Sequence, residues 1–319
     1  MALAHPSIRS SPVPLRNLIR GVAKAAIVAS IVVPLLRRRY PVPASITVAA
    51  VASGPFAIAT LNRRTRVRDA LIFTAQMWGF IMVHELPYDE PEKLRARLKV
   101  RYPIVIDRAI GGGRLPNSRL QSRMMRPGEP ITALDRTLTF AHWAWFFEPH
   151  LVLLFILARD EKRFVRAARQ MAAAFDLGCA AYIAFPTAPP WWAAANGYTG
   201  DEQVHRRMVD VGEQTWGSAW PALYETVDGN PWAAMPSLHF GASVLAAILL
   251  TESSPRAGVA GWTYAGVLGI ALVYLGEHYV IDLLAGLGLV ALVRLGEPLL
   301  EPLSMAVSRR VQRLELIAR

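Results

Sequence analysis

The chain is poor in charged residues and has a single cysteine. Asp, Glu, Lys and Arg make up 18% of its 319 residues, against roughly 25% in soluble domains. A single cysteine excludes an intrachain disulfide and a zinc site built from several cysteines. This residue, Cys179, lies inside an apolar run. Residues 111–113 are three glycines, but the lysine and spacing of a phosphate-binding P-loop are missing, so we expect a flexible turn. No segment repeats at a fixed period, which excludes a repeat architecture.

Apolar runs dominate the sequence instead. Hydrophobic residues make up 53% of the chain, and the mean hydropathy is +0.27. We expect an all-α fold, a polytopic membrane helical bundle of about eight spans. The first run also suits a signal peptide, but no small-residue cleavage site follows it, so we favour a helical hairpin. The predicted spans are residues 21–36, 42–61, 70–86, 137–157, 170–186, 236–252, 258–276 and 279–298.

The net charge is +11 and the isoelectric point about 10.3. A nucleic-acid partner is one explanation of this charge. The other is that basic loops orient the helices and contact anionic lipid headgroups. The hydropathy favours the second explanation, so we expect no nucleic-acid partner. The high arginine and alanine content suits a bacterium, and hence a bacterial cytoplasmic membrane.

The basic connectors predict the orientation of the helices. Residues 62–68 and 159–169 are short and basic, which places them in the cytoplasm. Counting spans from there brings Pro186–Trp192, His239 and His278 to one extracytoplasmic surface. The same count places the basic region 87–135 outside, against the charge rule, and an amphipathic segment lying on the headgroups explains that exception.

The sequence divides into five predicted regions. We expect a loose cytoplasmic N-terminal tail, N-terminal membrane helices, a basic interfacial region, a catalytic membrane core and a cytoplasmic C-terminal tail. Their bounds are 1–20, 21–86, 87–135, 136–298 and 299–319.

Two histidines and a carboxylate lie at membrane boundaries, where ionisable groups are costly and mark functional sites. His278 and Asp282 are four residues apart, which places them on one face of a helix. An aspartate that orients one imidazole nitrogen leaves the other as a nucleophile. His239, opposite, is a candidate acid for the leaving oxygen.

The stretch Pro236–His239 also predicts an anion site. Ser237 is a candidate helix N-cap, and the backbone amides of Ser237 and Leu238 lie at a helix start, where anions bind. The combination with His278 and Asp282 on the same membrane face favours phosphoryl transfer over a structural histidine.

At these residues the chain resembles the phosphatidic acid phosphatase type 2 superfamily, and most closely its inositol phosphorylceramide synthase branch. Three stretches carry the resemblance, which covers about residues 137–298. They are Phe185-Pro186-Thr187-Ala188-Pro189-Pro190-Trp191, Pro236-Ser237-Leu238-His239 and His278-Tyr279-Val280-Ile281-Asp282 with Ala285-Gly286 after it.

The resemblance implies a phosphatase-like core of six helices with an extracytoplasmic site. His278 would form a phosphohistidine, Asp282 would orient it, and His239 would act as acid and then as base. No metal and no cofactor are implied. The donor would be a membrane lipid phosphate, and the closest branch implies transfer of a phosphorylated headgroup to an alcohol such as inositol or a sugar.

The phosphate-binding residues depart from the family pattern. The Ser-Arg pair that many members have before the histidine is replaced by Ala271 and Leu272. Arg206 and Arg207 are therefore candidate phosphate ligands, with a solvated charge pair as the alternative. Pro189, Pro190 and Trp191 are further candidates for substrate contact, whereas a helix stop and an interfacial tryptophan are the structural alternative.

Several polar residues inside the predicted spans have weaker claims. Each is a candidate for lining a substrate or acceptor site, and hydrogen bonding between helices explains each equally well. They are His142, Glu148, His150 and Asp176.

Three classes of function remain open. The leading one is a lipid phosphotransferase or phosphatase, with an alcohol or water as acceptor; a simple lipid or polyprenyl phosphate phosphatase is the nearer alternative. The second is a metal-dependent membrane hydrolase, with His239, Glu277, His278 and Asp282 as ligands. The third is a transporter or a non-catalytic lipid-binding protein, with the histidines as a proton relay or anion site.

Overall fold

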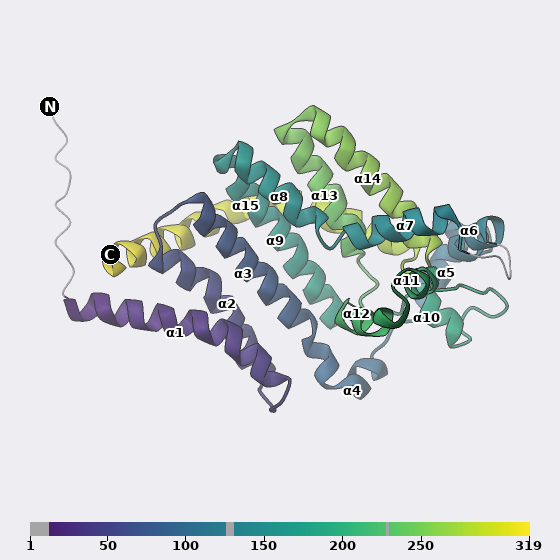
Figure 1. Cartoon of the computed structure of the whole chain (residues 1–319), viewed down its shortest axis with the longest axis horizontal. Helices are drawn as coiled ribbons and strands as arrows, with labels where there is room; N and C mark the ends of the chain where they lie inside the picture. Colours follow the sequence, from purple (N-terminus) through teal and green to yellow (C-terminus); the bar gives the residue numbers. More distant parts are fainter. Residues whose placement is uncertain (1–12, 126–130, 228–229) are drawn as a thin grey trace. The chain divides into compact units, whose positions relative to one another are not determined.

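A computed structural model of the chain describes residues 13–125, 131–227 and 230–319. These residues form helices joined by short connections, and they contain isolated β-bridges but no β-strand (Figure 1). The all-α prediction is confirmed. The chain divides into two compact units, Met1–Val83 with Glu297–Arg319, and His84–Gly296.

The first unit contains a helical hairpin. α1 (Val13–Arg37) and α2 (Ala44–Leu61) pack against each other. They approach so closely at Gly54 that a Cβ there would lie 2.9 Å from Ser30 Oγ. From α3 (Arg66–His84), the Trp78 indole donates a hydrogen bond to the Ser30 carbonyl at 2.9 Å.

The segments predicted as tails contain helix in the described residues, and the cytoplasmic location predicted for both stays a prediction. Residues 1–12 lie outside the described residues, but 13–20 are helical rather than loose, because a proline such as Pro14 is tolerated in a first helical turn. Residues 299–318 continue α15 (Val280–Ala318) despite Pro298 and Pro302. Within this unit, Arg68 pairs with Glu315 at 3.2 Å.

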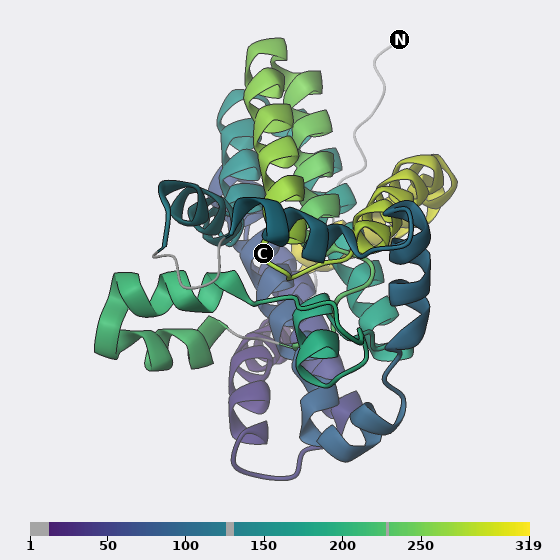
Figure 2. The ribbon, with the colours of Figure 1, turned by 90° about the vertical axis from the view of Figure 1, so that its right-hand side faces the viewer.

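The second unit holds the candidate site. α13 packs against α14, α9 and α8, and Figure 2 shows α13 and α14 side by side. Its elements are η1 (Leu86–Asp89), α4 (Pro91–Ala96), α5 (Arg101–Ile110), α6 (Pro116–Met124), α7 (Ala133–Ala144), α8 (Glu148–Arg159), α9 (Glu161–Ala184), α10 (Pro190–Ala195), α11 (Arg207–Trp216), η2 (Gly217–Ala219), α12 (Trp220–Val227), α13 (Leu238–Ser253), α14 (Pro255–Tyr274) and the first part of α15.

Each of the eight predicted spans contains helix, but only some of these helices are long and apolar enough to cross a membrane. In the described chain, α1, α2, α14 and α15 are long and apolar enough to cross a membrane. α7 and α8 make a fifth if they are one span bent by 55°. The predicted count of eight therefore stays a prediction.

The connector predicted over 159–169 is mostly helical. α9 begins at Glu161, because the Asp160 side chain accepts the amides of Lys162 and Arg163 at 3.0 and 3.1 Å and caps the helix. Its basic residues therefore line the first turns of a helix.

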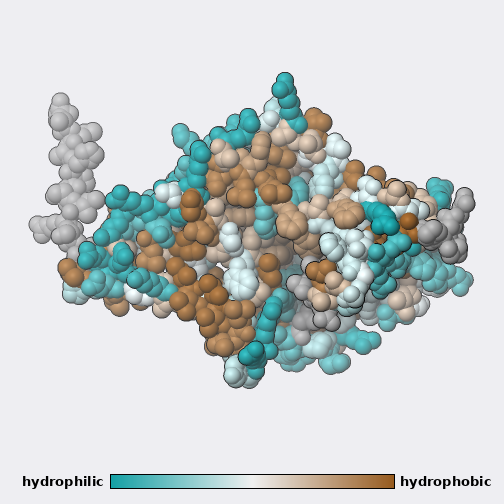
Figure 3. All heavy atoms as spheres, viewed as in Figure 1, coloured by the Kyte–Doolittle hydropathy of each residue, from teal (hydrophilic) through white to brown (hydrophobic). Residues whose placement is uncertain are grey.

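The two ends of the second unit are distinct. At one end, Arg294 of α15 binds Gln170 of α9 at 3.2 Å and Glu252 of α13 at 2.6 Å. At the other, Thr187 forms isolated bridges with Lys99 and Ala233, which connects three loops. Between these ends, α8 exposes Leu151 and Leu154, and α14 exposes Val259 and Ile270. Figure 3 shows hydrophobic residues gathered on part of the visible face of the protein, as expected of a surface that contacts lipid.

Candidate active site

His278 lies in the loop between α14 and α15, not on a helix. The prediction that His278 and Asp282 share a helical face is therefore wrong, because α15 begins only at Val280. Gly276 makes the turn, with φ at +79° and no room for a Cβ, which would lie 2.8 Å from the His205 carbonyl. Asp282 instead reaches back and accepts the amide of Tyr279 at 2.8 Å.

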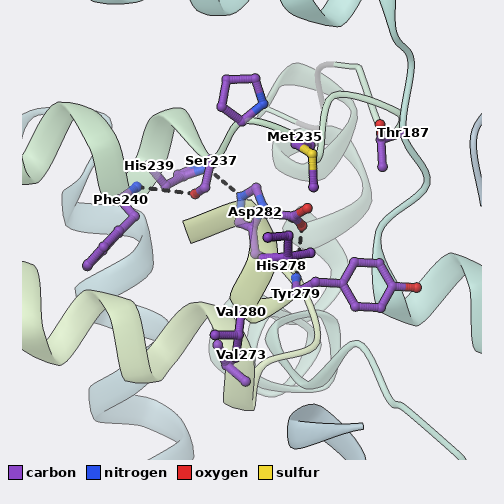
Figure 4. Close-up of polar contacts among 12 residues, drawn as sticks. Thr187, Met235, Ser237, His239, Phe240, Val273, His278, Tyr279, Val280 and Asp282 are labelled. Carbon is purple, nitrogen blue, oxygen red and sulfur yellow. Dashed lines mark hydrogen bonds and ion pairs between the residues drawn. The ribbon is translucent and has the colours of Figure 1, made fainter. Parts of the chain in front are cut away.

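The predicted catalytic residues nevertheless meet (Figure 4). His278 Nδ1 lies 3.4 Å from Asp282 Oδ2, and the two side chains are 5% and 0% exposed. His278 Nε2 lies 3.2 Å from Nδ1 of His239, which is in the first turn of α13. The carboxylate and the second histidine therefore contact opposite nitrogens of one imidazole.

Pro236–His239 packs tightly against α15. The Ser237 hydroxyl caps α13 by accepting the Phe240 amide at 3.3 Å, as predicted from its position. The amides of Ser237 and Leu238, predicted to bind an anion, donate instead to the Asp282 carbonyl at 2.9 Å and the Tyr182 hydroxyl at 3.2 Å. The Tyr182 hydroxyl in turn donates to the Pro236 carbonyl at 2.8 Å.

A glycine makes this close packing possible. A Cβ at Gly286 of α15 would lie 2.6 Å from the Ser237 carbonyl oxygen. The small residues after Asp282 therefore allow the backbones of α13 and α15 to approach at the site.

Arg206 lies beside the loop of residues 275–279, which carries His278 and which we call the catalytic loop after its predicted role. It forms a two-pronged ion pair with Glu277, at 2.9 and 3.2 Å, and its guanidinium lies 4.4 Å from the centre of the Trp191 ring. Burial would raise the pKa of Glu277, but the charge of Arg206 and its hydrogen bonds outweigh burial, and the pKa is lowered. This places a cation one residue from His278.

Arg207 points to a different partner. Its guanidinium binds Asp135 at 3.0 and 3.1 Å and Asp210 at 3.2 Å, and Tyr274 also donates to Asp135 at 2.6 Å. These contacts tie α11 to α7 and α14. Of the two arginines, Arg206 is therefore the one next to the histidines.

The Pro-Pro-Trp stretch starts α10 against the catalytic loop. Pro189 is the N-cap of α10 and Pro190 its first residue, and both are buried. The Trp191 amide donates to the Gly276 carbonyl at 3.2 Å. The stretch thereby supports the turn that carries His278.

Two polar side chains hold the catalytic loop from α5 and α6, and sequence reasoning missed both. Asp107 is fully buried and accepts the amides of Val280 and Ile281 at 2.8 and 2.9 Å. Asn117, also fully buried, donates to the carbonyls of Val273 and His278 at 2.7 and 2.9 Å. In the sequence each of them is simply a polar residue in a predicted interfacial region. That pattern does not predict a hydrogen bond to a residue about 160 positions away.

Asp107 caps the helix that carries Asp282. Burial raises the pKa of Asp107, while the hydrogen bonds from Ile281 and Val280 oppose that rise. A carboxylate at a helix N-terminus binds its first free amides and interacts favourably with the helix dipole.

The four residues predicted as an alternative metal site are arranged differently. Glu277 forms an ion pair with Arg206. In the described part of the chain, no group of three or more His, Cys, Asp and Glu side chains is arranged to hold a metal ion.

Comparison with known families agrees with this geometry. A family model described as the PAP2 superfamily matches residues 131–295, just over half of the chain. The chain belongs to the PAP2 superfamily. No solved structure was found to match it.

Two curated relatives are similar over shorter segments. An inositol phosphorylceramide synthase of Candida albicans is 31% identical over 116 residues, which are 34% of this chain and 24% of the relative. A phosphoinositol dihydroceramide synthase of Bacteroides thetaiotaomicron is 28% identical over 137 residues, 40% of this chain and 44% of the relative. The alignments thus span less than half of either relative.

The PAP2 match includes His239, His278 and Asp282, but it begins after α5 and α6. Asp107 and Asn117 therefore lie outside the matched PAP2 segment, although they contact the loop that carries the central histidine.

Proposed function

We propose that this protein is an integral-membrane lipid phosphotransferase that works through a phosphohistidine. The observation that carries the proposal is the contact of His278 Nε2 with His239 at 3.2 Å, with Asp282 behind the other ring nitrogen. A nucleophile, an orienting carboxylate and a second proton-transfer group are the parts that a two-step displacement needs.

In the first step, Nε2 of His278 attacks the phosphorus of the donor lipid. The P–N bond forms while the bond to the leaving oxygen breaks, and His239 in its protonated form gives its proton to that oxygen. Asp282 stabilises the positive charge that develops on the His278 ring. Its buried position strengthens this interaction, since water does not screen it.

In the second step, an acceptor hydroxyl attacks the same phosphorus from the position that the leaving group occupied. His239, now neutral, accepts the hydroxyl proton as the P–N bond breaks, and both histidines return to their starting states. Any alcohol carried on the phosphorus stays there throughout, so a donor phosphodiester transfers its whole phospho-headgroup.

Arg206 is our candidate for the phosphate charge. Its ion pair with Glu277 and its stacking on Trp191 hold the guanidinium next to the catalytic loop. A planar guanidinium binds phosphate oxygens in pairs. Arg207, Ser237, Leu238, Pro189 and Pro190 stay predictions as substrate contacts.

The relatives' names indicate the substrates to test. Both name a synthase whose product contains inositol, phosphate and a ceramide. We therefore propose a phosphoinositol headgroup as the group transferred and a membrane alcohol as acceptor, with the site on the extracytoplasmic face.

The deciding experiment traps the intermediate. Purified protein is mixed briefly with phosphatidylinositol labelled in its phosphate and then denatured in alkali, in which a phosphoramidate survives. We expect label on the wild-type protein and none on His278→Ala, with turnover of that variant lowered at least ~10²-fold. His205→Ala is the matched control, because His205 is exposed and its hydrogen bonds to Gln121 are made by its backbone amide and carbonyl.

Two results would contradict the proposal. One is near-normal turnover in His278→Ala. The other is activity that a chelator abolishes and zinc or manganese restores, which would indicate a metal-dependent hydrolase.

A further inference from the structure

A cavity lies at the end of the second unit that is opposite to the histidines, where α8, α9 and α13 pack against one another (Figure 1). Its volume is about 360 Å³, within the range of about 300–1,000 Å³ that is typical of ligand sites. From His239 to Glu252, which lines the cavity, α13 rises by ~20 Å. The cavity is therefore separate from the proposed catalytic site, and we call it the distal cavity.

The distal cavity has a charged wall and an apolar wall. Arg163 and Arg166, about one helical turn apart on α9, form the charged wall together with Glu252 of α13. Both arginine side chains are about half exposed, so a ligand can reach them. The apolar wall consists of Ile156, Ala167 and Leu249, all buried. These two walls match a ligand with a charged part and an apolar part.

The charge around the cavity is positive. Arg163 pairs with Asp160 at 3.1 Å, and Arg294 of α15 binds Glu252 at 2.6 Å. Arg166 lies 3.7 Å from the other Glu252 oxygen, which is longer than a hydrogen bond. The segment 159–169 carries five basic and two acidic residues, so ion pairs within it leave positive charge in excess. The charged part of the ligand is therefore an anion.

The surface around this end favours a lipid over a soluble anion. Leu154 of α8 and Val165 of α9 are 51% and 40% exposed, and Val259 and Trp262 in the first turns of α14 are 69% and 47% exposed. An exposed tryptophan beside arginines is typical of the level of the lipid headgroups. The distal cavity thus opens where a phospholipid presents its phosphate, and its neighbouring surface is apolar enough for acyl chains.

We propose that the distal cavity binds the headgroup of one anionic phospholipid. Arg163 and Arg166 contact its phosphate, since guanidinium groups bind phosphate oxygens in pairs. The first carbons of its chains lie against Ile156 and Leu249, and the chains continue over Leu154. Because the cavity is ~20 Å from His239 along α13, this lipid is bound and not converted.

The bound lipid supports the helices that carry the proposed catalytic residues. The distal cavity is lined by α8, α9 and α13, and Arg294 connects Glu252 at its wall to α15. α13 carries His239 and α15 carries Asp282 at the opposite end. A ligand that binds the folded state alone stabilises it, so an anionic phospholipid should raise the melting temperature of the whole protein.

The test measures that temperature for the full chain in phosphatidylcholine nanodiscs that contain increasing proportions of phosphatidylglycerol, a lipid with one negative charge. A second arm adds inorganic phosphate to nanodiscs of phosphatidylcholine alone. We expect saturable stabilisation of the wild type by phosphatidylglycerol and none by inorganic phosphate. Native mass spectrometry after transfer to detergent should find one more phosphatidylglycerol on the wild type than on Arg163→Gln/Arg166→Gln, and lipid held at the catalytic site cancels in this difference.

Variants assign the lipid to the distal cavity. In Arg163→Gln/Arg166→Gln, the proportion of phosphatidylglycerol needed for half of the stabilisation should rise at least about tenfold. Arg163→Lys/Arg166→Lys keeps the charge and loses the paired hydrogen bonds, so its response should be intermediate. Arg309→Gln/Arg310→Gln, at two exposed arginines of α15, removes the same charge elsewhere and should respond as the wild type does.

Four results would overturn the inference. A wild-type melting temperature that phosphatidylglycerol leaves unchanged does so without depending on whether any variant folds. Stabilisation by inorganic phosphate equal to that by the lipid indicates a site for soluble anions. Equal responses of Arg163→Gln/Arg166→Gln and the wild type place the lipid elsewhere, and an equal loss in Arg309→Gln/Arg310→Gln indicates a general effect of surface charge.

Discussion

At the scale of single residues, the proposed mechanism depends on which partner each ring nitrogen of His278 contacts. Nδ1 of His278 faces Asp282 and Nε2 faces His239, so the two ring nitrogens have different partners. The two histidines therefore have separable roles in the proposed mechanism. His278 must bond to phosphorus, whereas His239 only moves a proton.

This separation predicts different responses to the leaving group. His239→Ala should lose about 10²–10⁴-fold with a natural lipid donor, because its alkoxide leaves poorly without an acid. With a nitrophenyl phosphodiester as donor, whose phenolate leaves without a proton, the first step of that variant should recover most of the wild-type rate. His278→Ala should stay inactive with both donors. The rate of nitrophenolate release measures the effect, and equal losses with the two donors would contradict the assigned roles.

The ion pair of Glu277 predicts a pH dependence of stability. The folded-state pKa of Glu277 lies below its ordinary value of 4.5, so the charged carboxylate stabilises the fold above that pH, and this contribution is lost as the pH falls through the folded pKa. The wild type should melt at a higher temperature than Glu277→Gln at pH 7. The difference should shrink as the pH is lowered below 4.5, whereas a constant difference would contradict the assignment.

At the scale of secondary-structure elements, the site depends on how α15 begins. Asp107 of α5 accepts its first amides, Asn117 of α6 holds the preceding loop, and Gly286 lets α13 approach it. Each of these contacts fixes a backbone segment that carries one of the proposed catalytic side chains. Changes at these positions should therefore alter the alignment of the site.

Asp107→Asn should lower kcat about tenfold while the donor KM changes little. Asparagine has one acceptor oxygen, so the amides of Val280 and Ile281 can no longer both bind a carboxylate, and the negative charge at the helix N-terminus is lost. Steady-state kinetics separates the two parameters. Asp201→Asn, at an exposed aspartate, is the matched control, and a variant changed only in KM would contradict a positioning role.

Two glycines of α15 provide a matched pair. Gly286→Ala should destabilise the protein by about 1–3 kcal/mol, because the new Cβ would lie 2.6 Å from the Ser237 carbonyl oxygen. A Cβ at Gly288 meets nothing within 4 Å, so Gly288→Ala should be neutral or stabilising by up to about 1 kcal/mol through helix propensity. Chemical denaturation of both variants measures the difference, and equal effects would show that the contact at Gly286 is unimportant.

At the scale of the whole molecule, hydropathy and motif order predict most of what the structure contains. Each predicted span contains helix, and the spacing of His278 and Asp282 indicates their contact, although a helix start rather than a helical face produces it. The supports from α5 and α6 are not predictable in this way. A single buried Asp or Asn has no periodicity, and its partners lie on a distant part of the chain.

The structure also bears on the orientation of the basic region 87–135. Asn117 and Gln121 bind the carbonyls of His278 and Tyr274, so α6 lies at the same end of its unit as the catalytic loop. Loops within a structured region obey the positive-inside rule less strictly. If the site is extracytoplasmic, this basic region is extracytoplasmic with it.

Cysteine labelling tests the orientation in full. Cys179 is buried and is the only cysteine, so Cys179→Ala gives a background without other thiols. In that background, Ser122→Cys and Asp201→Cys place thiols at exposed positions of the catalytic end, and Arg256→Cys places one at the opposite end, beside the start of α14. A membrane-impermeant maleimide applied to intact cells should label the first two and leave the third until the membrane is opened. The reverse pattern would place the histidines in the cytoplasm, and labelling of Asp201→Cys without Ser122→Cys would separate α6 from the catalytic loop.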